Sequence, residues 1–228
     1  MQFSKTHLSI SGLSKSVLCR VPSKGKQKKV YLTFNDGPNP QITPWVAEQM
    51  KEAGNLKATF FCIGEHAEQY PEILKMLKKD GHEVANHSHG HESGWSTSQQ
   101  SYYRSFLECE KTLGKTDHFR PPYGRITPNQ AKALATRTQI VLWDVESGDY
   151  DTAKSGKQCL DDLIEQTQPG SIVVFRDSER SVPRLLYALP EYLKWLRENG
   201  YTPSLIPKDA TKKQQVRKLS LIGQLPLL

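Results

Sequence analysis

Residues 30–38 read VYLTFNDGP. The first five of these residues are apolar, aromatic or β-branched, which is typical of a buried β-strand. The polar turn Asn35-Asp36-Gly37-Pro38 follows directly. A carboxylate at the end of a buried strand is costly unless it has a partner or a function. The segment therefore predicts a strand with a polar site at its carboxyl end.

Runs of the same texture recur along the chain, separated by stretches with helical periodicity. The predicted strands are 30–34, 58–63, 83–86, 118–120, 140–145, 171–175 and 201–206, and the predicted helices are 42–53, 71–79, 98–113, 128–136, 159–166 and 183–199. Apolar strands that alternate with helices indicate a parallel sheet covered on its outer face. The sequence therefore predicts an α/β fold, a distorted (β/α)7 barrel in a single domain, with an open doubly wound sheet as the alternative.

Polar side chains follow five of these strands at the same end. Beyond Asp36, they are His87 to His91, Arg120 to Tyr123, Asp144 with Asp149, and Arg176 with Asp177. In a barrel, active sites are assembled from the loops at the carboxyl ends of the strands. The distribution favours the barrel over the open sheet and predicts a site at that end.

The histidines indicate a metal site. His87 and His91 are four residues apart at a strand exit, and Asp36 follows a neighbouring strand. Two imidazoles and one carboxylate form an open zinc site. The spacing alone also suits a solvent-exposed His-rich loop, and the joint placement of the three residues is what favours the metal.

Five motifs in order resemble the polysaccharide deacetylases, carbohydrate esterase family 4, also called the NodB-homology domain. The motifs are TFNDGP at 33–38, HSHGH at 87–91, RPPY at 120–123, WDVESGDY at 143–150 and IVVFRD at 172–177. The resemblance covers residues 30 to 206. It implies a distorted seven-stranded barrel with a divalent metal, usually zinc, held by Asp36, His87 and His91.

The resemblance also implies residue roles. In the family, a water held by the metal attacks the acetamide carbonyl of an N-acetylated sugar. The general base stands at position 35 and the acid that protonates the leaving amine at position 176. Arg120 orients the base, Asp149 tunes the acid, and the backbone amide of Tyr123 helps to hold the oxyanion. Tyr123, Trp95, Tyr150 and Val174 are the candidate contacts to the substrate.

Two positions depart from the family in a way that affects proton transfer. Asn35 stands where the family has the catalytic aspartate, and Arg176 where it has the catalytic histidine. A neutral amide does not accept a proton at physiological pH, and a guanidinium does not cycle one. In the fourth motif, Tyr150 replaces a tryptophan and Glu146 an aspartate.

The resemblance implies metal-dependent deacetylation of N-acetylhexosamine glycans, of chitin or peptidoglycan type. The substitutions at positions 35 and 176 predict that this activity is strongly reduced. The alternative is a non-catalytic carbohydrate- or anion-binding pseudoenzyme, since zinc with Arg120 and Arg176 would attract a small anion. Glu92, Glu146 and Asp177 are candidates for a substitute base.

Charge and composition set the remaining expectations. The net charge of +7 comes from a basic arm at 1–29 and a basic tail at 208–228, which flank the barrel at 30–207. Nucleic-acid binding ranks last because no aromatic residues interleave with the charges of the tail. We expect no membrane span and, without a recognisable signal peptide, a cytoplasmic location, with a truncated secreted protein as the alternative. The cysteines, at 19, 62, 109 and 159, are expected to be reduced thiols, three of them in or near the core.

Overall fold

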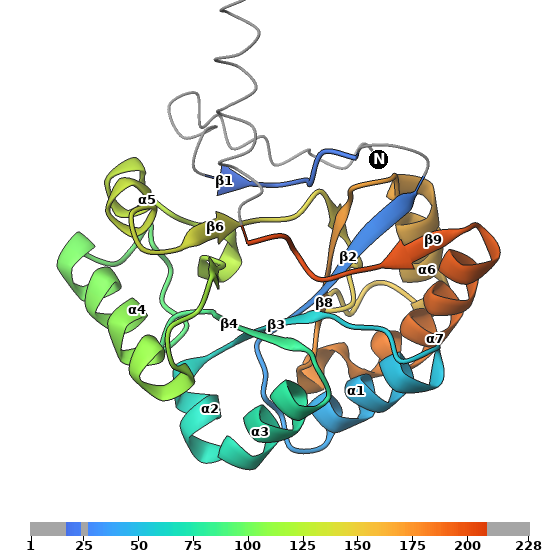
Figure 1. Cartoon of the computed structure of the whole chain (residues 1–228), viewed down its shortest axis with the longest axis horizontal. Coiled ribbons are helices and arrows are strands. Elements are labelled where there is room, and N and C mark those ends of the chain that lie inside the picture. The colour runs from blue at the N-terminus through green and yellow to red at the C-terminus, as the bar shows by residue number, and fades with distance from the viewer. Residues whose placement is uncertain (1–16, 24–26, 209–228) are drawn as a thin grey trace, which may run out of the picture.

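The computed structural model describes residues 17–23 and 27–208. Its strands are β1 (Val17–Leu18), β2 (Lys28–Asn35), β3 (Thr59–Cys62), β4 (Glu83–Asn86), β5 (His118–Phe119), β6 (Gln139–Val141), β7 (Val145–Glu146), β8 (Ile172–Arg176) and β9 (Tyr201–Pro203). Its α-helices are α1 (Ile42–Glu52), α2 (Gly64–Gln69), α3 (Pro71–Lys79), α4 (Gln99–Leu113), α5 (Pro128–Leu134), α6 (Gly156–Gln166) and α7 (Val182–Glu198). Figure 1 shows the helices around the outside of a curved central sheet. No helix in these two ranges is long and apolar enough to cross a membrane.

All strand pairs of the sheet are parallel, in the order β1-β6-β5-β4-β3-β2-β8-β7, and β9 pairs with β2. The parallel α/β architecture is confirmed. The segment after β1, at one edge of the sheet, reaches the start of β8 next to the other edge, because Arg20 bridges to Ser171 and the Val21 N–H donates to the Gly170 carbonyl at 3.0 Å. The sheet therefore curls into a barrel-like form rather than the open doubly wound arrangement.

Alternation along the strands separates an outer core from the barrel interior. On β2, Val30, Leu32 and Phe34 pack into the cluster shared with the helices. The other face of the same strand carries Tyr31, which belongs to the interior cluster, and with it Thr33 and Asn35. This alternation places Asn35 on the inner face, at the carboxyl end of the sheet.

One predicted strand, 140–145, is wrong as a single element. The structure divides it into β6, which pairs with β5 and β1, and β7, which pairs with β8. Between them, the carboxylate of Asp144 accepts hydrogen bonds from the Ile172 N–H at 2.6 Å and the Ser171 hydroxyl at 3.0 Å. The Asp144 carboxylate thus accepts hydrogen bonds that the backbone carbonyls of a continuous strand would otherwise accept.

Local chemistry accounts for several helix ends. Gly54, Gly81 and Gly200 follow helices with φ of 117°, 79° and 72°, a left-handed conformation that favours glycine at a helix C-terminus. Thr127 caps α5 in a capping box, whereas Thr43 lies inside α1 rather than before it. The short helix α2 has no counterpart among the predicted helices.

The sheet extends into the segment assigned to the basic arm, since β1 and the first residues of β2 precede residue 30. The rest of the arm and nearly all of the tail lie outside the described residues. Cys62, Cys109 and Cys159 are buried free thiols and Cys19 is an exposed one, as expected for reduced cysteines.

Candidate active site

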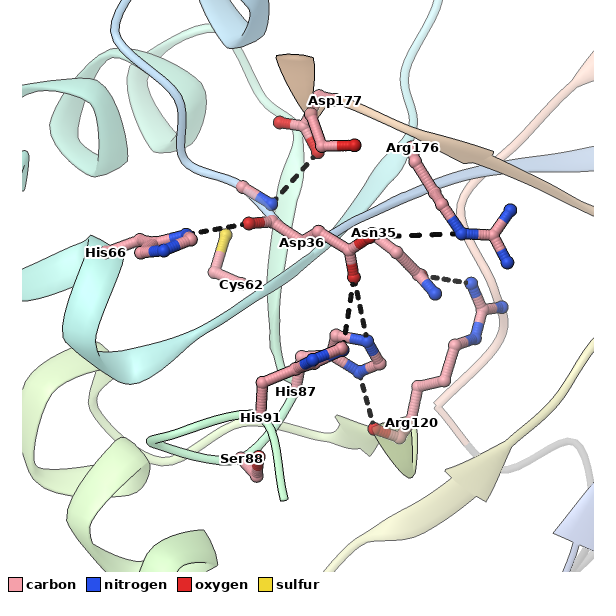
Figure 2. A network of polar contacts seen from close by, with 12 residues as sticks. Asn35, Asp36, Cys62, His66, His87, Ser88, His91, Arg120, Arg176 and Asp177 are labelled. Carbon is pink, nitrogen blue, oxygen red and sulfur yellow. Dashed lines mark hydrogen bonds and ion pairs between the residues drawn. The ribbon is translucent and has the colours of Figure 1, made fainter. Parts of the chain in front are cut away.

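Asp36, His87 and His91 meet at the carboxyl end of the sheet (Figure 2). Asp36 directly follows β2 and His87 directly follows β4. The Asp36 Oδ1 atom lies 3.4 Å from His87 Nε2 and 3.3 Å from His91 Nε2, and the candidate ligand atoms all lie within 4.8 Å of one another. The sequence prediction that these side chains converge is confirmed as geometry.

The chemistry of His87 suits a metal ligand. Its Nδ1–H donates to the Arg120 carbonyl at 2.7 Å, which leaves the lone pair on Nε2. The Nε2 atom is buried without a hydrogen-bond partner. Burial lowers the pKa of His87 to about 4, so the ring is neutral at physiological pH. A neutral imidazole with an orphaned nitrogen, next to a carboxylate, fits a divalent cation such as zinc.

The carboxylate of Asp36 is ionised. Burial alone would raise its pKa, but the imidazoles of His87 and His91 beside it hold the pKa well below its ordinary value. The backbone of Asp36 is held as well, because the His66 Nδ1–H donates to its carbonyl at 2.8 Å (Figure 2).

Left-handed backbone conformations concentrate around this site. Among the described residues other than glycine, positive φ occurs at Asp36 (78°), Ser88 (64°), His91 (58°) and Tyr123 (58°), and elsewhere at Asn55. Such conformations cost free energy and cluster where side chains must be aimed at a site. Two of the three candidate ligands, Asp36 and His91, have this left-handed conformation.

Asn35 is buried and bonded to Arg120. Its Oδ1 accepts a hydrogen bond from Arg120 Nη1 at 2.8 Å (Figure 2). The guanidinium of Arg120 is fully buried and also donates to Thr33 Oγ1 and to the carbonyls of Val141 and Leu142. It stacks on Phe61, with its Cζ 4.0 Å from the ring centroid. All four of its hydrogen-bond acceptors are neutral, so the carboxylate partner implied by the family is replaced by an amide.

Arg176 is surrounded by carboxylates. Its Nη2 lies 2.9 Å from Glu146 Oε1, its Nη1 3.4 Å from Asp149 Oδ1 and its Nε 3.9 Å from Asp36 Oδ2. The guanidinium also stacks on Tyr150 at 4.0 Å. Burial alone would lower the pKa of Arg176, but Asp149 and Glu146 raise it above its ordinary value, so the side chain stays charged. Burial raises the pKa of Asp149 to about 6 although Arg176 opposes the shift.

The three candidates for a substitute base are all engaged elsewhere. Glu92 accepts a hydrogen bond from the Ser105 hydroxyl at 2.6 Å, and Glu146 is paired with Arg176. Asp177 accepts from the Gly37 N–H at 3.1 Å and from the Thr43 hydroxyl, and burial raises its pKa to about 7. The structure therefore favours none of them as a replacement for the family's aspartate.

The predicted glycan contacts differ in accessibility. Trp95 and Tyr123 are 59% and 58% exposed and Tyr150 is 37% exposed. The Tyr123 ring lies 4.6 Å from that of His91, which puts it at the mouth of the site. Val174, in contrast, is fully buried on β8, so the structure offers no surface of Val174 to a glycan.

Sequence reasoning missed Thr33. Its hydroxyl accepts from Arg120 Nη1 at 2.7 Å and donates to the Val173 carbonyl at 2.7 Å. Strand alternation was the available signal, because Thr33 precedes Asn35 by two residues and so shares its face. Thr33 thus helps to position Arg120, which in turn donates a hydrogen bond to Asn35.

These features define a class of protein: an α/β barrel that brings an Asp-His-His constellation to the carboxyl ends of its strands. A family model described as polysaccharide deacetylase matches residues 23–140. The chain belongs to the polysaccharide deacetylase family.

Individual relatives agree with this assignment. The chain is 33% identical over 152 residues to a peptidoglycan-N-acetylglucosamine deacetylase of Bacillus cereus, covering 64% of this chain and 54% of the relative. It is 31% identical over 160 residues to a chitooligosaccharide deacetylase of Azorhizobium caulinodans, covering 66% and 74%. The chain thus spans about half the length of the Bacillus relative.

The fold is shared with solved structures of the family. The crystal structure of the Bc1960 peptidoglycan N-acetylglucosamine deacetylase superposes with a TM-score of 0.77 at 28% identity, over 84% of this chain and 91% of that one. This likeness confirms the predicted distorted (β/α)7 barrel.

Proposed function

We propose that this protein binds N-acetylhexosamine glycans at a divalent-metal site and hydrolyses their N-acetyl groups only slowly. The observation that carries the proposal is the pairing of an intact Asp36-His87-His91 constellation with an adjacent Asn35 whose carbonyl oxygen is committed to Arg120. The glycan class is supported by relatives that act on peptidoglycan and chitooligosaccharides.

Asp36, His87 and His91 would hold the metal. When bound, zinc supplies Lewis-acid polarisation of a carbonyl and lowers the pKa of a water molecule toward about 7. The rate of hydrolysis then depends on whether the residues around these ligands can transfer protons.

Asn35 places a hydrogen-bond donor where the family has a carboxylate that accepts a proton. Because its Oδ1 accepts from Arg120, the Nδ2 amide group is left to face away from the guanidinium. An amide N–H₂ donates hydrogen bonds and does not take a proton, so Asn35 is suited to bind a carbonyl or hydroxyl oxygen of a ligand. The position supports binding and does not support general-base catalysis.

Arg176 removes the second proton-transfer group. A guanidinium held by Glu146 and Asp149 keeps its proton throughout the physiological pH range. General acid and base groups each contribute about 10²- to 10⁴-fold to rate, and losses within one catalytic unit do not simply multiply. Slow residual hydrolysis is the expected result.

The alternative, a non-catalytic binding protein, differs only in the size of the residual rate. Its anion-binding version has less support. Arg176 is already neutralised by carboxylates, and the four hydrogen bonds that Arg120 donates go to acceptors in the barrel wall. Neither guanidinium is available to a small anion at the metal.

Mass-spectrometric detection of acetyl loss from chitin oligosaccharides, with zinc supplied, tests the proposal. The protein is compared with its Asn35→Asp/Arg176→His double variant and with a His91→Ala derivative of that variant as the metal-site control. We expect turnover to rise by at least about 10²-fold in the double variant and to be lost again with His91→Ala. Equal and rapid deacetylation by the unaltered protein would contradict the proposal.

A further inference from the structure

A second feature lies beside the metal site, on the loops that follow β4 and β5. Trp95 and Tyr123 are strongly exposed aromatic side chains, and Arg125 lies between them. The Arg125 Cζ atom is 5.0 Å from the Trp95 ring centroid and 5.7 Å from that of Tyr123. We refer to Trp95, Tyr123 and Arg125 as the mouth triad.

The mouth triad is held in place by the protein around it. The Gly94 N–H donates to the Arg125 carbonyl at 3.2 Å. The Gln130 side chain donates to the carbonyls of Gly94 and Thr97 at 2.9 and 3.1 Å. A Cβ atom at Gly94 would lie 2.5 Å from the Arg125 carbonyl oxygen, so the close approach of the two loops requires glycine. The two loops are thus locked together before any ligand binds.

Arg125 differs from the other arginines of the site in its partners. Arg176 is paired with carboxylates and Arg120 with buried neutral acceptors. Within residues 17–23 and 27–208, the Arg125 guanidinium has no hydrogen-bond acceptor and no carboxylate partner, and it lies over the two rings. An exposed guanidinium oriented by aromatic faces keeps its full capacity for bidentate bonding to a carboxylate.

The position of the triad relates it to the metal site. The Tyr123 ring is 4.6 Å from the ring of His91, a candidate metal ligand. If the acetamide group of one sugar faces the metal, the adjacent sugar of the oligosaccharide would lie over Tyr123, Arg125 and Trp95. Rigid exposed aromatics flanking a convergent polar group are features of a ligand subsite.

We propose that the mouth triad is a subsite for a carboxylate-bearing sugar adjacent to the N-acetylated sugar at the metal site. Arg125 binds the carboxylate, and Trp95 and Tyr123 carry the sugar ring. This inference rests on the proposed function, because it requires a glycan at the same site. It defines the preferred ligand as an acidic oligosaccharide rather than neutral chitin.

Isothermal titration calorimetry on the full chain, with zinc supplied, tests the subsite. The three ligands are chitotetraose, a tetrasaccharide of alternating N-acetylglucosamine and N-acetylmuramic acid, and the methyl ester of that tetrasaccharide. The ester has the same shape without the charge. We expect the acid to bind about three- to tenfold more tightly than its ester, between the effect of an exposed ion pair and that of a charged hydrogen bond.

Variants assign the preference to the triad. Arg125→Gln is expected to bind acid and ester equally while retaining affinity for chitotetraose, and Arg125→Lys to keep part of the preference. Arg197→Gln, an exposed arginine on the outer helix α7, serves as the charge-matched control and should change nothing.

The outcomes separate this inference from the proposed function. Equal affinity for acid and ester in the unaltered protein, or a preference that survives Arg125→Gln, overturns the subsite while binding of chitotetraose upholds the glycan site. Absence of binding by all three ligands overturns both.

Discussion

Asn35 and Arg176 are register partners on the neighbouring parallel strands β2 and β8. The two positions at which the chain departs from the family's proton-transfer residues therefore lie side by side at the edge of the candidate metal site. Each has partners that satisfy it: Arg120 for Asn35, and Glu146 with Asp149 for Arg176. Two neighbouring departures from the family's motifs are thus each accommodated by hydrogen bonds at the site.

The first prediction concerns metal binding by the three candidate ligands. Replacing His87 or His91 by alanine removes one of the three ligand atoms that lie within 4.8 Å of one another. We expect zinc affinity to fall by at least about 10²-fold and the zinc-induced rise in Tm to disappear, since a ligand stabilises only the state that binds it. His89→Ala, in the same loop, is the control and should keep the zinc response. An equal Tm shift in all three variants would place the metal elsewhere.

The second prediction concerns the charge of Arg176. Its guanidinium nitrogen Nε lies 3.9 Å from Asp36 Oδ2, so it competes with a cation for that carboxylate. Arg176→Gln removes the competing charge and also frees Glu146 and Asp149 to add negative potential. We expect zinc affinity to rise by at least about tenfold, because unit charges about 4 Å apart interact by about 4 kcal/mol at an effective dielectric near 20. Competition with a chromogenic chelator measures the change. Arg125→Gln controls for net charge, and a rise of the same size in that variant would remove Arg176 as the cause.

The third prediction concerns the stability that Arg120 provides. Truncation to methionine leaves Thr33, Asn35 and two backbone carbonyls, all buried, without their donor. We expect the free energy of unfolding to fall by about 2–4 kcal/mol, the cost of unsatisfied buried acceptors. Urea denaturation measures the loss. The exposed Arg125→Met variant should stay within about 0.5 kcal/mol of the unaltered protein, and equal effects of the two changes would show that Arg120 has no special structural role.

The fold and the metal constellation could be predicted because they depend on local pattern. Apolar runs such as 30–34 and 171–175 identify buried strands, and the polar residues after them mark the edge at which parallel strands end. Strand direction brings the loops that carry His87, His91 and Asp36 to the same edge of the sheet, and the left-handed backbone at Asp36 and His91 then orients these two residues.

The features that could not be predicted from the sequence depend mostly on contacts between residues far apart in the chain. The break between β6 and β7 arises where the Leu142 carbonyl accepts from Arg120 and the Asp144 carboxylate accepts from Ile172. The orientation of the Asn35 amide follows from Arg120, 85 residues away along the chain. The short helix α2 has six residues and begins at a glycine, which gives too little periodicity to recognise. Val174 matched a motif, yet strand alternation inside the barrel buries it.

The last prediction concerns stability at acid pH and a residue away from the metal site. His82 is buried, and its Nδ1 accepts a hydrogen bond from the Ala58 N–H at 3.2 Å, which requires that nitrogen to be unprotonated. Burial, with a further contribution from the charge of Lys57, lowers the pKa of His82 from 6.5 to about 4. Between these two values the unfolded chain takes up a proton that the native protein does not. This contribution to stability is therefore complete above pH 6.5 and is lost as the pH falls toward about 4.

His82→Asn separates this effect from other titrating groups. The asparagine Oδ1 can accept the same N–H and does not titrate, so the variant keeps the hydrogen bond and loses the pH dependence that His82 contributes. We expect the free energy of unfolding, measured by urea denaturation in metal-free buffer, to fall less steeply with decreasing pH in the variant over the range 6.5 to about 4. His87 titrates in the same range in both proteins, so the difference between the two curves isolates His82. Parallel curves would mean that His82 has the same pKa in the native and unfolded states, and that the Ala58 N–H then has another acceptor below that pKa.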